Sequence, residues 1–331
     1  MRYLDYLHPL DPRRLTLEVI AVCGITEPPV DEQVILEYFD IALFRTPITA
    51  IPGCESLAPL EHKLSGLLVK YGGAESPALW ANPRMSHGRF RWTVSHEVGH
   101  LDLGHEGTYF FDGEPTLRPA MGRPESLPTD YRQVGYQGVL LDAADAPAHT
   151  FQPVLIETPE SLKRKRQERD ANHYAAELLM PAPMFFPEAR DLPVGIQAVN
   201  QLCERYDASF EATAIRYAQA CPERCAVFAA EPVLDNAGAV ASFDVAYCIR
   251  GRSPFLRGLR QGNSLPFAGL LSAAWTAEGP VQGSVTADLL SLGSRATVAV
   301  DALRLGQHNR LVAIIWLESG QMPMLEEEGY A

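Results

Sequence analysis

The sequence predicts an α+β fold, with helices and short strands mixed in its first two thirds and strands dominating the rest. Residues 30–45 have the pattern of a short helix followed by a strand, and residues 64–73 and 76–83 read as two strands around a Gly-containing turn. Between about residue 226 and residue 318, four segments alternate or run apolar between turn residues: CAVFAAEPVL, AVASFDVAYCIRG, RATVAVDALRL and NRLVAIIWLES. A chain of 331 residues with 47% hydrophobic residues is long enough for two or three domains.

The stretch RWTVSHEVGHLDLGH, residues 91–105, has the pattern of a metal-binding helix. His96 and His100 are four residues apart, so on a helix both rings lie on one face and can bind a single ion. Glu97 is displaced around the helix from that face but can still reach a water on the metal, which makes it the candidate general base. Gly99 allows another element to approach closely. The alternative is a structural pair of histidines on a buried helix.

Two histidine nitrogens alone make a weak zinc site, so a third ligand is expected. His105 falls at the wrong register, because the three-histidine zincin pattern HExxHxxGxxH needs its last histidine six residues after the second one. A continuing helix would turn His105 about 140° away from His100. We therefore interpret His105 as a helix-end residue, favoured there as a cation near the helix C-terminus.

A second helix is predicted from about residue 159 to 180, with Thr158 as N-cap, Pro159 in its first turn and Pro181 at its end. Glu168 heads a stripe of small and apolar residues that ends at Leu179. The other members of the stripe, at helical spacing, are Ala171, Asn172 and Ala175.

Glu168 is accordingly the predicted third metal ligand, and the alternative is an ordinary solvated helix carboxylate. Asp170 and Glu177 lie about 200° and 180° around the helix and are expected to face away. Asn172, one turn after Glu168, is placed to hold a ligand side chain in position. Two histidines and one glutamate leave a coordination position open for water.

These two segments together resemble the ImmA/IrrE family of metallopeptidases. FRWTVSHEVGHLDLGH (90–105) is similar to the family pattern R-x-R-F-T-x-x-H-E-x-G-H, with Arg89 and Arg91 in place and Trp92 at the phenylalanine position. ERDANHYAAELLMP (168–181) is similar to E-x-x-A-N-x-F-A-A-x-L-L-M-P. The resemblance covers roughly residues 10–220.

The resemblance implies a cytoplasmic, Zn²⁺-dependent peptidase of zincin-like fold, with His96, His100 and Glu168 as the metal ligands and Glu97 as the catalytic base. Known targets in the family are DNA-bound helix-turn-helix repressors, in mobile-element induction and in stress or DNA-damage responses. We therefore expect a zinc endopeptidase that regulates transcription by cutting such a repressor. The alternatives are a non-proteolytic anti-repressor module that keeps the zinc site, and a purely structural zinc site or histidine pair.

The expected organisation has three parts. Residues 1–190 form the metallopeptidase domain, in which 106–153, rich in Gly, Pro, Asp and Ala, is an insertion. Residues 191–225 form a helix-turn-helix-like element, broken at Asp207 and restarted at Ser209. Residues 226–331 form a strand-rich α+β domain, expected to be a GAF-like sensor or a docking domain. The strand at LSGLLVK is the expected edge for pairing with extended substrate.

The net charge of −13 opposes nonspecific binding to nucleic acid. Residues 195–225 hold three arginines against four acidic residues, so the helix-turn-helix-like element lacks a phosphate-binding charge pattern. The one basic run, KRKR at 163–166, is interpreted as a solvated helix segment. The expected partner is a protein substrate.

The six cysteines are scattered along the chain, which differs from the density of a secreted disulfide scaffold. CPERC, residues 221–225, has no second cysteine pair or nearby histidine, and ordinary free thiols are favoured there. No segment reaches the 18 or so uninterrupted apolar residues of a membrane span, so a cytoplasmic protein is expected.

Overall fold

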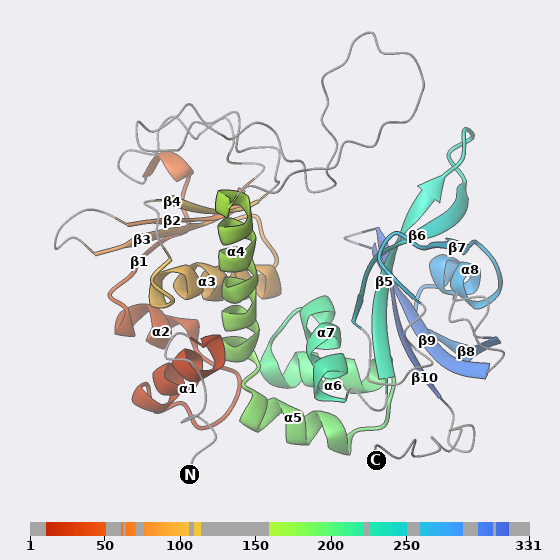
Figure 1. Ribbon diagram of the computed structural model, residues 1–331, viewed down its shortest axis with the longest axis horizontal. Coiled ribbons are helices and arrows are strands. Elements are labelled where there is room, and N and C mark those ends of the chain that lie inside the picture. The colour runs from red at the N-terminus through yellow and green to blue at the C-terminus, as the bar shows by residue number, and fades with distance from the viewer. Residues whose placement is uncertain are drawn as a thin grey trace, which may run out of the picture. The chain divides into compact units, whose positions relative to one another are not determined.

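The computed structural model describes residues 11–50, 61, 64–70, 76–105, 109–113, 159–221, 225–249, 259–286, 297–306 and 309–317. Contacts between residues divide the chain into two compact units, Met1–Leu179 and Met180–Ala331. Both helices and sheets are present in each, so the predicted α+β class is confirmed (Figure 1). The finer division at residues 190 and 225 stays a prediction. Among the described residues, no helix is long and apolar enough to cross a membrane.

In the first unit, the described residues form a small sheet and four α-helices. Its elements in chain order are α1 (Pro12–Val22), α2 (Glu32–Tyr38), β1 (Ala42–Phe44), the 3₁₀ helix η2 (Ile48–Ala50), β2 (Leu64–Val69), β3 (Ala78–Ala81), α3 (His87–Asp102), β4 (Tyr109–Gly113) and α4 (Pro159–Leu179). The strand order is β1-β3-β2-β4, with β1 parallel to β3 and the other two pairs antiparallel. The helix and strand predicted within residues 30–45, and the strands predicted on either side of residues 71–75, are confirmed.

The position of β2 differs from the sequence-based prediction. LSGLLVK was the predicted edge strand, but β2 pairs with β3 on one side and with β4 on the other. The terminal strand of the described sheet is β4, which lies inside the predicted insertion 106–153. Its residues YFFDG are too few to show a strand period beside the Gly- and Pro-rich residues that follow, and residues 114–153 lie outside the described part of the chain.

Helix α3 lies in the core of this unit, where it packs against the sheet and is crossed by α4 (Figure 1). Two glycines allow the close approach. A side chain at Gly66 of β2 would overlap the Thr93 methyl group on α3, and a Cβ at Gly99 of α3 would come within 3.0 to 3.1 Å of the Tyr174 side chain on α4. The close contact predicted at Gly99 is therefore confirmed.

Helix α2 is attached to α3 by a buried cation. Arg91 of α3 is 1% exposed, and its Nε lies 2.9 Å from Glu32 Oε2 at the start of α2. The same guanidinium donates to the carbonyl oxygen of Val30. Arg91, one of the residues that carries the family resemblance, thus has a structural contact that fixes how α2 packs on the metal-site helix.

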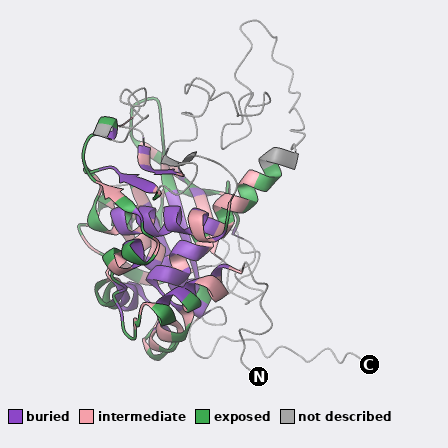
Figure 2. Ribbon diagram, turned by 90° about the vertical axis from the view of Figure 1, so that its left-hand side faces the viewer, coloured by how far each residue is buried: buried purple, intermediate pink, exposed green. Residues whose placement is uncertain are grey.

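Helix α4 changes character along its length. Its early turns, including the basic run 163–166, are exposed or half-buried, and from Ala171 onward most residues are buried against α1 and α3 (Figure 2). The helix begins at Pro159 and ends at Leu179, within one residue of the predicted bounds. Glu168 lies where the exposed part meets the buried part, so its side chain is both anchored and accessible.

The second unit contains a six-stranded antiparallel sheet of order β7-β6-β5-β10-β9-β8. Its elements are α5 (Ala182–Asp191), α6 (Ile196–Tyr206), α7 (Phe210–Ala220), β5 (Cys225–Leu234), β6 (Val240–Ile249), β7 (Ser264–Pro266), α8 (Gly269–Thr276), β8 (Val281–Thr286), β9 (Thr297–Leu305) and β10 (Arg310–Leu317). All four predicted strands are confirmed, as are the helices on either side of Asp207, whose φ is 49°. Helix α8 contacts β8 and β9, and the core includes Phe243 and Trp275.

Helices α6 and α7 contact strands of the same unit: α6 contacts β9, and α7 contacts β5 and β6. Arg216 of α7 is 2% exposed and donates to the carbonyl oxygen of Met180. Its charge is therefore used inside the unit.

Candidate metal centre

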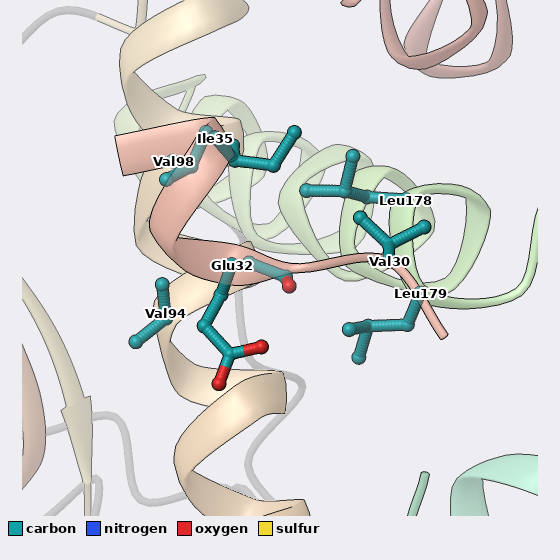
Figure 3. Close-up of a pocket in the computed structure, with 8 residues that line it drawn as sticks. Val30, Glu32, Ile35, Val94, Val98, Leu178 and Leu179 are labelled. Carbon is teal, nitrogen blue, oxygen red and sulfur yellow. The ribbon is translucent and has the colours of Figure 1, made fainter. Parts of the chain in front are cut away.

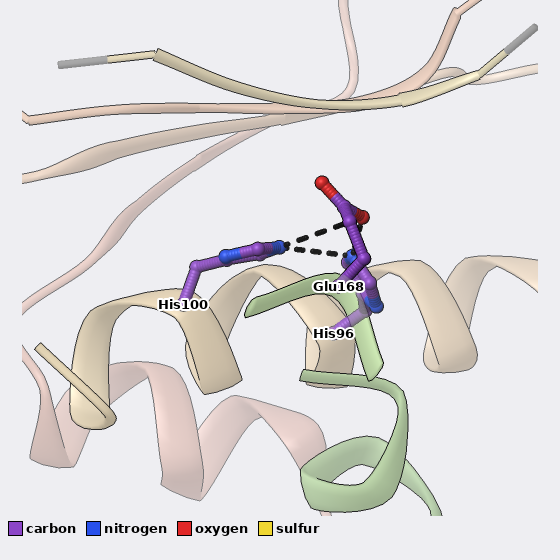
Figure 4. Close-up of side chains that lie close together, drawn as sticks. All are labelled: His96, His100 and Glu168. Atoms are coloured by element: carbon purple, nitrogen blue, oxygen red, sulfur yellow. Dashed lines mark hydrogen bonds and ion pairs between the residues drawn. The ribbon is translucent and has the colours of Figure 1, made fainter. Parts of the chain in front are cut away.

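Three predicted ligand residues are brought together where α4 crosses α3. His96 Nε2 lies 3.1 Å from His100 Nε2, and Glu168 Oε2 lies 3.5 Å from the former and 3.9 Å from the latter. Figure 4 shows the three side chains converging on the side of α3 that faces the sheet. Within the described part of the chain, they are the one group of three His, Cys, Asp or Glu side chains whose ligand atoms gather closely enough for a metal ion.

These distances fit a tetrahedral cation. Ligand atoms about 2.0 to 2.2 Å from zinc in a tetrahedron are about 3.3 to 3.6 Å from each other. The three observed separations, 3.1, 3.5 and 3.9 Å, bracket that range. Two nitrogens and one carboxylate oxygen are also a donor set that leaves the fourth position of a catalytic zinc open to water.

The hydrogen bond of His96 suits metal binding. His96 Nδ1 lies 3.1 Å from Asn172 Oδ1. An amide oxygen only accepts, so Nδ1–H of His96 donates to it and the Nε2 lone pair points toward Glu168 and His100. Asn172 occupies the place in which the sequence predicted a partner for a ligand side chain.

His100 is held in its neutral form. Burial, together with the neighbouring His96 and His105 rings, lowers the pKa of His100 to about 2. A metal ligand must have a free nitrogen lone pair, so an imidazole that stays unprotonated at neutral pH needs no proton release before it binds a cation.

Glu97 lies on the face of α3 that packs against β2. Its side chain is fully buried, and its Oε1 would be 3.4 Å from a Cβ at Gly66. Glu97 is next in sequence to His96, and it is not among the three side chains whose ligand atoms gather closely enough for a metal ion. The structure thus keeps Glu97 out of the ligand set, as the helical spacing predicts.

The competing carboxylates of α4 have other partners. Glu177 is fully buried, and its Oε1 lies 3.1 Å from Arg13 Nε and 3.5 Å from His173 Nε2. Asp170 is paired with Arg166 at 3.7 Å and with Arg169 at 3.3 Å. Neither belongs to the group of three side chains whose ligand atoms gather closely enough for a metal ion.

His105 lies at the helix end, as predicted, but makes a contact that was not predicted. Helix α3 ends at Asp102, and the chain turns back through Gly104, whose φ is 64°. The turn places His105 Nδ1 2.8 Å from His100 Nδ1. Burial lowers the pKa of His105, and the part of the prediction that treats it as a cation at the helix C-terminus stays a prediction. Counting residues around a helix assumes that the helix continues, so it cannot detect a reversal of the backbone after the helix end. Gly104 was the residue that indicated such a reversal.

Lys70 was not predicted as part of the site. It follows β2 directly, and its Nζ donates to the carbonyl oxygens of His100 at 3.3 Å and His105 at 2.9 Å. A cation at the end of a helix satisfies carbonyl groups that have no partner within the helix. Lys70 therefore ties the C-terminus of the metal-site helix to the sheet.

A pocket between α2, α3 and α4 lies apart from these residues. It is lined mainly by aliphatic side chains, with Val94 and Val98 of α3 opposite Leu178 and Leu179 of α4 (Figure 3). Glu32 at its margin is the carboxylate that pairs with Arg91. Its lining includes none of the three candidate ligands, so it does not extend the metal centre.

Residues 145–217 match the family model described as the IrrE N-terminal-like domain, Peptidase_M78. The match includes Glu168 and Asn172 but not residues 96–100, and it supports the ImmA/IrrE family and a peptidase. A solved structure of a Mycobacterium tuberculosis transcriptional regulator is similar with a TM-score of 0.47 and 11% identity, over 94% of this chain and 88% of that chain. No curated protein matches the chain.

Proposed function

We propose that this protein is a zinc-dependent endopeptidase that regulates gene expression by cutting a helix-turn-helix repressor, in a stress, DNA-damage or mobile-element response. The observation that carries the peptidase activity is the convergence of His96, His100 and Glu168, together with the buried Glu97 on the same helix as the two histidines. The match to a peptidase family model supports the same activity. The repressor as substrate rests on the resemblance to the ImmA/IrrE family.

In this proposal His96 and His100 each present the Nε2 lone pair, and Glu168 presents a carboxylate oxygen. Zinc bound by these three would lower the pKa of a water molecule toward 7 and polarise the carbonyl group of the scissile peptide. The Glu97 carboxylate accepts the water proton as the carbonyl is attacked, and then gives it to the leaving amine. A zinc site that served only the fold would need no such base.

The experiment is incubation of the purified protein with helix-turn-helix repressors encoded beside its gene, followed by mass spectrometry of the products. With zinc, we expect two fragments that define one scissile bond. Prior treatment with a chelator should abolish cleavage, and added zinc should restore it. A repressor that leaves its DNA but stays intact would instead support an anti-repressor that acts by contact alone.

A further inference from the structure

The two histidines of the candidate metal centre have the same arrangement of ring nitrogens. In each, Nε2 points into the cluster and Nδ1 points to a partner outside it. The partner of His96 is Asn172 Oδ1 at 3.1 Å, and the partner of His100 is His105 Nδ1 at 2.8 Å. The first partner is an obligate acceptor, which fixes the position of the His96 proton.

The second pair has one proton to share between two facing nitrogens. If His100 Nδ1–H donates to His105, the His100 Nε2 lone pair is directed at Glu168 and His96. If His105 donates instead, the His100 proton sits on Nε2, inside the ligand cluster, where it would block a cation. Metal binding therefore requires that His105 accept through Nδ1 and carry its own proton on Nε2.

The backbone holds His105 in this position. The N–H of His105 donates to the His100 carbonyl oxygen at 3.1 Å, and Lys70 Nζ donates to the carbonyl oxygens of both residues. The ring centroids are 4.9 Å apart at 67°, an edge-on arrangement that points nitrogen at nitrogen. These hydrogen bonds fix the backbone that carries His105, and its side chain is half-buried. The ring is therefore held in place more firmly than that of an exposed residue after a helix.

We propose that His105 is a positioning residue that fixes the tautomer and orientation of His100, with Lys70 holding the turn that presents it. The proposal rests on the proposed zinc site. Outer partners of ligand histidines typically account for about 10- to 100-fold of metal affinity. The expected contribution of His105 is of that size, while the number of zinc ions bound at saturation stays unchanged.

The test is zinc affinity, measured by competition with a chromophoric chelator. His105→Phe keeps a ring but removes the acceptor, and we expect zinc to bind about 10- to 100-fold more weakly. His105→Asn places an amide oxygen close to the former Nδ1, as Asn172 does for His96, and should recover most of the affinity. His87→Phe, an exposed histidine at the other end of α3, is the matched control and should bind zinc as the wild type does.

A measurement on the wild type tests the proposal without any variant. Nitrogen NMR of the ¹⁵N-labelled imidazoles in the zinc-loaded protein should show His100 protonated at Nδ1 and His105 protonated at Nε2. His105 protonated at Nδ1, unchanged affinity in His105→Phe, or an Asn variant no better than Phe would each overturn the proposal. Absence of zinc from the wild type would instead overturn the proposed function itself.

Discussion

Carboxylates of the same chemical type acquire different roles from their surroundings in this molecule. Glu168 is half-buried and points at two imidazole nitrogens, Glu97 is fully buried against β2, and Glu177 is fully buried beside Arg13. Glu177 is compensated by a nearby cation, whereas Glu168 Oε2 lies 3.5 Å from His96 Nε2 and 3.9 Å from His100 Nε2. This position beside two imidazole nitrogens makes Glu168 the carboxylate best placed to bind a metal ion together with them.

The first prediction concerns Glu168→Gln, which keeps the size of the side chain but removes its charge and one of its strong metal-binding oxygens. Wild-type protein should contain one zinc per chain, and Glu168→Gln should lose most of it after dialysis, because two imidazoles alone bind zinc weakly. Metal content by mass spectrometry measures this. Asp170→Asn, two residues away but paired with arginines, is the control and should keep its zinc. Equal zinc in both variants would remove Glu168 from the ligand set.

At the scale of elements, the metal site depends on how closely α3 packs between β2 and α4. Gly66 and Gly99 are the positions at which each neighbour comes nearest. Packing of this kind is sensitive to a single added methyl group, because the displaced side chains or backbone must shift.

Gly66→Ala, whose Cβ would lie 2.4 Å from the Thr93 methyl group, should lower the free energy of unfolding by about 1 to 3 kcal/mol. Gly99→Ala should lower it by less, because the looser contact with Tyr174 is offset by the higher helix propensity of alanine. Urea unfolding of the full chain measures the change. Gly279→Ala is the control, since a Cβ there meets no atom within 4 Å. If the two α3-packing variants were as stable as Gly279→Ala, the close packing described for α3 would be wrong.

In the second unit, helix α6 is capped by a residue 105 positions away in sequence. Its N-cap residue Gly195 has no side chain, and Asp301 Oδ2 of β9 accepts from Ile196 N at 2.8 Å. Loss of such a cap typically costs about 1 kcal/mol, so Asp301→Ala should be destabilised by about that amount. Because the cap joins a helix to a strand, it fixes part of the packing of the sheet against the helical pair.

This cap also predicts a pH dependence. Burial raises the pKa of Asp301 from its ordinary value of 3.8, against the opposing effect of the bond from Ile196 N. A raised pKa in the folded state contributes stability that is complete below pH 3.8 and is lost as pH rises through the folded pKa. The stability of wild type minus that of Asp301→Asn should therefore be larger at pH 4 than at pH 7. A difference that grows toward pH 7 would contradict the assignment.

Helices and strands whose sequence signals are local could be predicted, whereas positions that depend on tertiary contacts could not. Ser209 caps α7 and Asp207 breaks the helical pair, and both signals lie within the residues concerned, so these helices were predicted. The neighbours of β2 in the sheet are set by tertiary pairing, which sequence pattern does not encode, and its edge position was predicted wrongly. Helix α8 was missed because GLLSAAWT is short and mostly apolar, so it shows no clear helical period.

The same reasoning applies to the site. His96 and His100 follow from a spacing of four on one helix, and the place of Glu168 follows from a stripe on another, so the cluster could be predicted before the helices were seen to cross. The contacts of His105 and Lys70 depend on a backbone reversal and on a strand end meeting a helix end. Neither is a periodic feature, and neither was predicted.

At the scale of the whole molecule, the chain is acidic and divides into two units. The family match of residues 145–217 covers the last part of the first unit and the first part of the second. The candidate ligands and base are all in the first unit. The proposed catalytic chemistry therefore belongs to that unit, and a peptidase remains the function that its geometry supports best.

The most direct test of this account is the rate at which zinc-loaded protein cuts the repressor, compared between wild type and Glu97→Gln. The variant keeps the three ligands but has no carboxylate to accept the water proton, and general-base catalysis is typically worth about 10² to 10⁴ in rate. We predict a loss of at least that order with zinc content and fold unchanged, and no release of the repressed gene in cells. Cleavage at the wild-type rate, or full release of the gene without cleavage, would contradict the account.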